Sequence, residues 1–275
     1  RTLNPGTDRG LTGERINTVS AFDEIVSQRP PALTGLELRS KLDRVRSFVS
    51  ERNMKGLHFV QEGALRWLTG LRHSVIDISP SGISPITAVV RFSEKRATVT
   101  VIGEPYELVR AMPEVRRRVS VCPDIEVLSA STLGPADGII TPATPDYEAI
   151  VLSIVGPIPP SGDDNQIQKY EWLARVSRAV LSRVLRRTQV GTTGWSIRGN
   201  VLKEFCDIGV ECNLVLVGVT GQEIYPHPVV NEDHRVTEDS FAKIAVGARY
   251  SDAMYSITAM AKFGSPLTAH ERIVE

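Results

Sequence analysis

A histidine held between two prolines is the residue of this sequence best suited to proton transfer. His227 stands in the run Tyr225-Pro226-His227-Pro228. An imidazole changes its charge near neutral pH, so it can take a proton from water and pass it to a leaving nitrogen. Proline fixes the backbone angle φ, so the two prolines restrict the loop and position the ring. We interpret His227 as a candidate catalytic residue; a histidine that only packs in a proline-rich loop is the alternative.

Such a mechanism needs a second titratable group, and the sequence offers two carboxylates near the histidine or the strands that follow it. Asp252 lies in a Tyr-Ser-Asp turn four residues before Ser256, so on a regular strand both side chains point to the same face. Asp252 is therefore the second catalytic candidate, and an exposed turn aspartate is the alternative. Glu223 and Tyr225 precede His227 and are candidates for substrate binding.

Residues 218–264 must position these groups, and their pattern predicts a strand, the histidine-bearing loop, and two apolar strands that meet at the Tyr-Ser-Asp turn. This layout resembles the metal-binding hairpin of the creatinase/prolidase/methionine aminopeptidase family, also called the pita-bread family. The family pattern runs Asp-x-Gly-Ala, then an aromatic residue, then Asp-Ile-Thr-Arg. Counting along it puts the two family aspartates at Ala245 and Ser256. The matching residues are Gly247-Ala248, Tyr250 and Ile257-Thr258.

The same residues favour the fold and argue against metallopeptidase chemistry. A dinuclear site for divalent ions needs several anionic oxygens, which a methyl group and a neutral hydroxyl cannot supply. We therefore expect no metal and no other cofactor. In creatinase, a metal-independent relative, a histidine in the corresponding loop is the proton shuttle, and the resemblance implies this role for His227.

The resemblance implies a metal-independent enzyme that acts on a C–N bond of a small nitrogenous or amino-acid-derived substrate. Two alternatives stay open. One is a catalytically inactive peptidase-like domain that binds a peptide or a protein. The other is a Xaa-Pro-type metallopeptidase whose pattern is misaligned, because the segment from His227 to Ala245 is slightly longer than is usual in the family.

The first half of the chain predicts an amphipathic helix, ended by Gly56, and then a buried strand at 57–60. The helix has an apolar stripe (Leu38, Leu42, Val45, Val49) and basic side chains expected to face solvent (Arg39, Lys41, Arg44, Arg46). The run Trp67-Leu68-Thr69-Gly70 follows, which resembles the amino-terminal domain of creatinase and prolidase relatives. In dimeric relatives the next loop approaches the neighbour's pocket, so the resemblance implies Arg72 and His73 as substrate contacts.

Strands and helices alternate along the chain, which is typical of an α/β fold. Strands are predicted at 86–92, 97–102, 125–128 and 138–140, and a helix at 106–112. Prolines cluster between Pro135 and Pro160, which indicates a domain boundary. We therefore predict an α/β (α+β) chain: an extension at 1–35, a creatinase-type α/β domain at 36–160 and a partial pita-bread domain at 161–275, whose C-terminal part is missing.

The second domain is predicted to begin with a long helix at 165–187, followed by a helix that runs to Asp207 and a strand at 213–219. Thr193 or Ser196 can cap the second helix. The long helix has an apolar face, and Lys169 and the arginines up to Arg187 are expected on its solvated face. The apolar face is predicted to contain Ile167, Tyr170, Leu173, Ala174, Val180, Leu181 and Val184.

Composition limits the partners of the protein. The sequence has 32 acidic and 32 basic side chains, and this balance gives no support to nucleic-acid binding. No apolar run approaches the roughly 20 residues that cross a bilayer, so we expect no membrane association and a cytoplasmic protein. The three cysteines are expected to be buried and reduced. The resemblance implies a homodimer that binds a small-molecule or peptide-like substrate.

Overall fold

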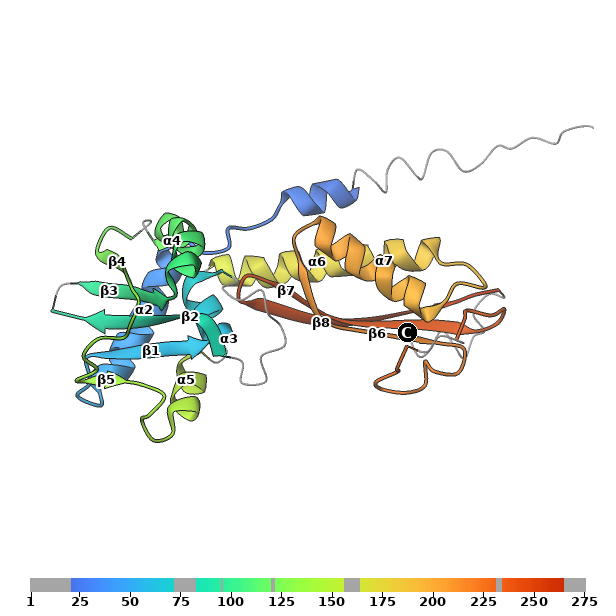
Figure 1. Ribbon diagram of the computed structural model, residues 1–275. Helices are drawn as coiled ribbons and strands as arrows, with labels where there is room; N and C mark the ends of the chain where they lie inside the picture. Colours follow the sequence, from blue (N-terminus) through green and yellow to red (C-terminus); the bar gives the residue numbers. More distant parts are fainter. Residues whose placement is uncertain are drawn as a thin grey trace, which may run out of the picture. The chain divides into compact units, whose positions relative to one another are not determined.

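The computed structural model describes residues 21–71, 83–94, 96–119, 122–155, 164–230 and 234–264. They form two compact units, shown in Figure 1. The five-stranded unit comprises Pro31–Lys169 together with the hairpin tip Ser251–Ala253. The three-stranded unit comprises Arg1–Pro30, Tyr170–Tyr250 and Met254–Glu275.

The five-stranded unit is a mixed sheet with helices, and its strand order is β4-β3-β2-β1-β5. β1 pairs antiparallel with β2 and parallel with β5, while β3 pairs antiparallel with β2 and parallel with β4. The α/β expectation for this part of the chain is therefore confirmed. Its elements are α2 (Gly35–Ser50), β1 (Gly56–Gln61), α3 (Glu62–Thr69), β2 (Ile83–Phe92), β3 (Ala97–Gly103), α4 (Pro105–Val119), β4 (Ile125–Ala130), β5 (Ile139–Ile140) and α5 (Tyr147–Val155).

Helix α2 forms as predicted, and its apolar stripe of Leu38, Leu42, Val45 and Val49 lies in the core. Thr34 caps its first turn, because the hydroxyl accepts a hydrogen bond from the Glu37 N–H. The expectation that Lys41 faces solvent is wrong. Its side chain is 0% exposed and forms an ion pair with the carboxylate of Glu37, one turn earlier.

The role predicted for Gly56 is also wrong. Helix α2 already ends at Ser50, and Gly56 is instead the first residue of β1. A Cβ at this position would lie 2.2 Å from the Val90 carbonyl oxygen on the neighbouring strand. Gly56 is therefore needed because β1 and β2 approach each other closely here.

Helix α5 lies inside the proline-rich stretch, where the sequence predicted only a domain boundary. It forms because Tyr147, Val151 and Ile154 share one face and join the core of the unit. The Tyr147 hydroxyl donates to the carbonyl of His58 on β1. Burial raises the pKa of Tyr147 to about 12, so the phenol stays a protonated donor at neutral pH.

The three-stranded unit is an antiparallel arrangement with strand order β6-β7-β8. Figure 1 shows α6 and α7 on one face of this sheet. The strands and helices predicted for this stretch are all present, and Thr193 caps α7 by accepting from the Ser196 N–H. The elements are helical residues 21–27, α6 (Asp164–Arg187, of which residues 170–187 belong here), α7 (Gly194–Asp207), β6 (Glu211–Val219), β7 (Phe241–Tyr250) and β8 (Ala253–Lys262).

Helix α6 has the predicted bounds but not all of the predicted faces. Ile167 and Tyr170 are 48% and 47% exposed, whereas Lys169, expected in solvent, is fully buried. Trp172, outside the predicted apolar face, is also fully buried, and its indole N–H donates to the Ile25 carbonyl in helical residues 21–27. This side of α6 is covered because the chain segment before α2 packs on it.

The predictions for the cysteines and for membrane-spanning helices can be compared with the structure. Of the three cysteines only Cys122 is buried; Cys206 is exposed and Cys212 is half-buried. No helix within the described ranges has the length and apolar character needed to cross a bilayer.

Candidate functional site

The sheet of the three-stranded unit has one buried face and one open face. Alternate residues of β7 are buried, including Ile244 and Val246. The residues between them must point to the opposite side, because successive side chains alternate across a strand. We call that side the open face. On β6 and β7 it carries Leu214, Leu216, Gly218, Lys243, Ala245 and Gly247, whose register partners are Leu214–Gly247, Leu216–Ala245 and Gly218–Lys243.

Strand β8 continues the open face. The Ser256 hydroxyl oxygen lies 4.0 Å from the place that a Cβ at Gly247 would occupy, so Ser256 points to the same side as Gly247. Met254 and Met260 lie two and four positions from Ser256, so they point to the same side, and they are 48% and 49% exposed. With Leu214, which is 46% exposed, they make the open face largely apolar.

The loop that carries His227 is fixed to the open face by a lysine. Lys243 Nζ donates to the Tyr225 carbonyl at 2.8 Å and to the Glu223 carbonyl at 3.4 Å. Because Lys243 lies two residues from Ala245 on β7, this loop is held beside the part of the face that contains Ala245. His227 is exposed at the surface of the loop. The sequence analysis did not identify Lys243, although a lysine inside an otherwise apolar strand was the available signal.

Glu223 and Tyr225 lie in the same loop as His227, so the structure brings three predicted site residues together. Glu223 has one carboxylate oxygen, Oε2, that is buried and has no hydrogen-bond partner in the part of the chain that the structure describes. Tyr225 is 52% exposed. A buried carboxylate oxygen without a donor is costly, and a bound N–H or O–H group would satisfy it.

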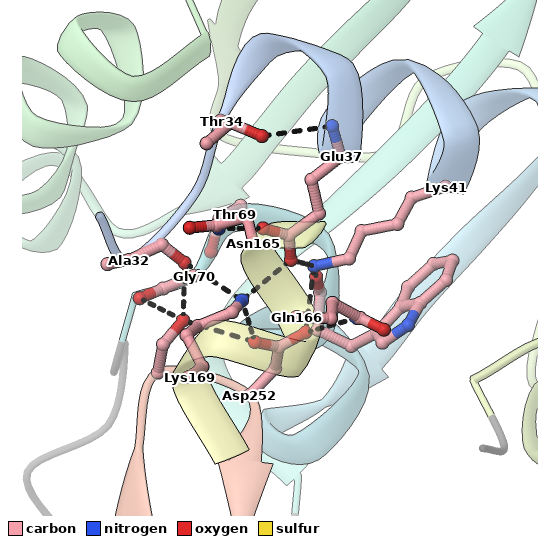
Figure 2. A network of polar contacts seen from close by, with 12 residues as sticks. Ala32, Thr34, Glu37, Lys41, Thr69, Gly70, Asn165, Gln166, Lys169 and Asp252 are labelled. Carbon is pink, nitrogen blue, oxygen red and sulfur yellow. Dashed lines mark hydrogen bonds and ion pairs between the residues drawn. The ribbon is translucent and has the colours of Figure 1, made fainter. Parts of the chain in front are cut away.

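Asp252 has different surroundings from those predicted. It belongs to the five-stranded unit, and its side chain is 7% exposed instead of lying free in a turn. Figure 2 shows it among the charged groups of α2 and the start of α6. Its carboxylate accepts from Lys41 Nζ at 2.9 Å and from Lys169 Nζ at 2.5 Å. Both oxygens are therefore already engaged.

These groups form a network of four buried charges. Glu37 pairs with Lys41 at 2.6 Å and with Lys169 at 2.7 Å, so two carboxylates and two ammonium groups balance each other. Neutral groups complete the network. The side-chain amide of Asn165 donates to Glu37, and that of Gln166 donates to Asp252. Lys41 also donates to the Trp67 carbonyl, and Lys169 to the Ala32 carbonyl. We call Glu37, Lys41, Lys169 and Asp252 the charge network.

The charge network determines how two of its members titrate. Burial favours the neutral form of Asp252, but the ammonium groups of Lys41 and Lys169 outweigh it and hold the pKa of Asp252 below its usual value. Burial likewise opposes the charge of Lys169, and the carboxylates of Asp252 and Glu37 outweigh it and raise the pKa of Lys169. Asp252 and Lys169 are therefore held in their charged forms at neutral pH.

Comparison with solved structures gives the fold. An Xaa-Pro dipeptidase from Bacillus anthracis matches with a TM-score of 0.58 and 17% identity, over 86% of this chain and 68% of that one. The prolidase from Pyrococcus horikoshii matches with a TM-score of 0.60 and 12% identity, over 86% and 68%. The X-Pro aminopeptidase from Thermotoga maritima gives 0.56 and 15%, over 82% and 67%. This chain has the pita-bread fold. No protein-family model and no curated protein matches the sequence.

The open face carries Ala245, one of the two positions where the family pattern has an aspartate. On β6 and β7, the residues next to Ala245 on this face are Lys243, Gly247 and, across the strand pair, Leu216. None of these offers an anionic oxygen, and Lys243 brings a positive charge. The donor set at this place does not fit a divalent ion. Within the described ranges, no group of three or more His, Cys, Asp or Glu side chains is arranged to hold a metal ion.

Two predicted substrate contacts, Arg72 and His73, lie outside the described residues. The Leu-Thr-Gly run before them has a defined role in the pita-bread chain. It ends helix α3, and Gly70 adopts a left-handed conformation with φ of 67° as its C-cap. A Cβ at Gly70 would lie 2.9 Å from the Ala32 carbonyl oxygen. This run is therefore explained by the end of a helix.

The glycine at the base of the histidine loop gives a first test of the site. Gly218 lies so close to the loop that a Cβ would be 2.9 Å from the Gln222 carbonyl oxygen and 3.0 Å from the Glu223 N. Gly218→Ala should therefore displace the loop and lower the free energy of unfolding by about 1–3 kcal/mol. Denaturant unfolding measures the effect. Gly199→Ala on α7 is the matched control, because a Cβ added there has no neighbouring atom within 4 Å. This variant should leave the free energy of unfolding unchanged or slightly higher. Equal effects of the two variants would contradict the predicted clash.

Proposed function

We propose that this protein is a hydrolase of a C–N bond in a small, amino-acid-derived substrate, and that it uses His227 for proton transfer without a divalent ion. The proposal is supported first by the fold, since the solved structures that resemble the chain are named as Xaa-Pro dipeptidase, prolidase and X-Pro aminopeptidase. The observation that carries it is the loop of His227, which Lys243 fixes beside the open face.

The residues of this face suggest how the reaction would proceed. The exposed imidazole of His227 would take a proton from water as the water attacks the carbon of the C–N bond, and would return that proton to the leaving nitrogen. Lys243 would keep the loop in position through its two bonds to backbone carbonyls. The buried Glu223 Oε2 offers an acceptor for an N–H group of the substrate. Leu214 and Met254 provide apolar contact area on the same face.

A second candidate function is the binding of a peptide without turnover. It is favoured by the apolar side chains of the open face. It is also favoured because, among the described residues, no carboxylate accepts a hydrogen bond from the imidazole of His227. The two functions differ in one observable. A binding domain would retain dipeptides and small amides unchanged, whereas the proposed hydrolase would release an amine from one of them.

Metal dependence provides the direct test of the proposed mechanism. The purified protein, dialysed against a chelator, should release amine from its substrate at the same rate as the untreated protein, because no step needs an ion. A library of dipeptides and small amides, followed by detection of primary amines, identifies the substrate. Elemental analysis is run on the same samples. Loss of turnover on chelation, with recovery on adding Mn²⁺ or Zn²⁺, would show that the pattern is misaligned and that the protein is a metallopeptidase.

A further inference from the structure

A depression in the three-stranded unit lies away from the open face, between helical residues 21–27 and helix α6. Its volume is about 340 Å³, and Ile25 forms one wall. Ala174 and Ala179 line the α6 side, where their short side chains leave the space unfilled. Trp172, whose indole N–H donates to the Ile25 carbonyl, fixes the two helical segments to each other. Both walls of the depression, helical residues 21–27 and helix α6, are therefore held in place by contacts between them.

Three arginines of α6 surround this apolar depression, and none of them has a carboxylate partner within the described ranges. Arg175 donates to the side-chain carbonyl of Gln28, and Arg186 donates to the Ser182 hydroxyl. Arg178 is exposed and forms no hydrogen bond with another described residue. A cation bound only to neutral groups keeps its charge available for an anion.

The other arginines at the end of the same helix show that this is not a general property of α6. Arg183 and Arg187 both pair with Glu204 of α7, at 3.4 Å and 2.7 Å. On the side of α6 that faces α7 the arginines are therefore paired with a carboxylate, whereas the three arginines around the depression form no ion pair within the described ranges. Three guanidinium groups beside one depression can attract an anionic ligand.

The spacing of the arginines indicates the size of the ligand. Arg175 and Arg186 are eleven positions apart, which corresponds to about 16 Å along a helix at its usual rise. A single phosphate or carboxylate is short compared with this length of helix, so an extended ligand fits the three arginines better. A nucleic-acid backbone is long enough, but it has no apolar side chain to place between them. An acidic peptide has both, since carboxylates can alternate with apolar residues on one helical face.

We propose that this depression, lined by Ile25, Ala174 and Ala179 and surrounded by Arg175, Arg178 and Arg186, is a docking site for an acidic amphipathic peptide segment of a partner protein. Apolar side chains of the peptide fill the depression, and its Asp or Glu side chains pair with the three guanidinium groups. The site is separate from the open face, so this inference does not depend on the proposed hydrolase activity.

A designed peptide tests the proposal on the intact protein. The probe is a fluorescein-labelled helix of about 14 residues, with leucines on one face and glutamates on both flanks. Fluorescence polarisation should show saturable binding that weakens as salt is raised. Arg178→Glu should weaken binding about 10-fold or more, because the peptide loses one charge-assisted hydrogen bond and is repelled by the new carboxylate. Ala179→Trp should abolish binding, because the indole fills the depression.

Controls separate a specific site from general charge attraction. Arg116→Glu on α4 makes the same charge change at an exposed arginine of the five-stranded unit and should leave binding unchanged. A probe with serine in place of leucine should not bind. The proposal is overturned if the protein does not bind the peptide, if Arg178→Glu and Arg116→Glu behave alike, or if single-stranded DNA of the same charge competes equally well. Turnover by Arg178→Glu should equal that of the wild type in every case.

Discussion

Replacing His227 by glutamine should reduce turnover by a factor of about 10² to 10⁴, the usual contribution of general acid–base catalysis. Glutamine keeps hydrogen-bonding groups in the loop but cannot carry the proton between water and the leaving nitrogen. The side chain is exposed, so the free energy of unfolding should stay within ~0.5 kcal/mol of the wild-type value. The measurement is kcat and kcat/KM on the substrate identified by the amide library.

The pH dependence of the rate makes this test sharper. The limb of the profile that belongs to an imidazole should be present in the wild type and absent from His227→Gln. His234→Gln is the matched control, because His234 is a half-buried histidine in the same unit and the proposed mechanism does not use it. Undiminished turnover by His227→Gln would refute the shuttle and leave peptide binding as the stronger candidate.

The second large effect concerns stability and comes from the charge network. Asp252→Asn removes one of two carboxylates that balance two buried ammonium groups. An uncompensated buried charge costs about 3–5 kcal/mol, so the free energy of unfolding should fall by that amount. Asp207→Asn is the matched control. Asp207 pairs with Lys203 at the surface, where the side chains are 56% and 70% exposed, and its loss should cost less than ~1 kcal/mol.

At acid pH the free energy of unfolding of Asp252→Asn should become equal to that of the wild type. The pKa of Asp252 is lower in the folded chain than its usual value of 3.8, so its contribution to stability is complete above 3.8 and is lost as pH falls through the folded pKa. Denaturant midpoints measured from neutral pH down to acid should therefore converge only below 3.8. A difference in denaturant midpoint that stays constant at all pH values would show that Asp252→Asn acts through packing. Equal losses of unfolding free energy in Asp252→Asn and Asp207→Asn would show that burial of the charge network is unimportant.

The fold could be predicted from the sequence because most elements carry a local signal. The stripe of Leu38, Leu42, Val45 and Val49 repeats at helical spacing and is buried as expected. The two strands that meet at the Tyr-Ser-Asp turn are confirmed as β7 and β8. The family resemblance added what periodicity cannot give, namely the pita-bread arrangement, which the structural matches confirm as a fold.

The sequence predicted the charged core poorly for a physical reason. A rule based on polarity places lysine in solvent, but Asp252 pairs with both Lys41 and Lys169 from a distant part of the chain. Glu37 pairs with Lys169 in the same way, and with Lys41 inside helix α2. Lys41 and Asp252 are separated by 211 positions, so no window of sequence contains the pair. For Lys243 the residue type was a signal, but its acceptors are backbone carbonyls, so the sequence could not indicate which segment it binds.

The long separation between Lys41 and Asp252 has a consequence for synthesis on the ribosome. The nascent chain emerges from its amino end, so α2 and the strands after it leave the ribosome well before the hairpin tip is made. Until Ser251–Ala253 arrives, Lys41 and Lys169 share only one anionic partner, Glu37. The five-stranded unit thus depends on a late segment for its last carboxylate, and interrupted translation would leave a product that chaperones and proteases can recognise.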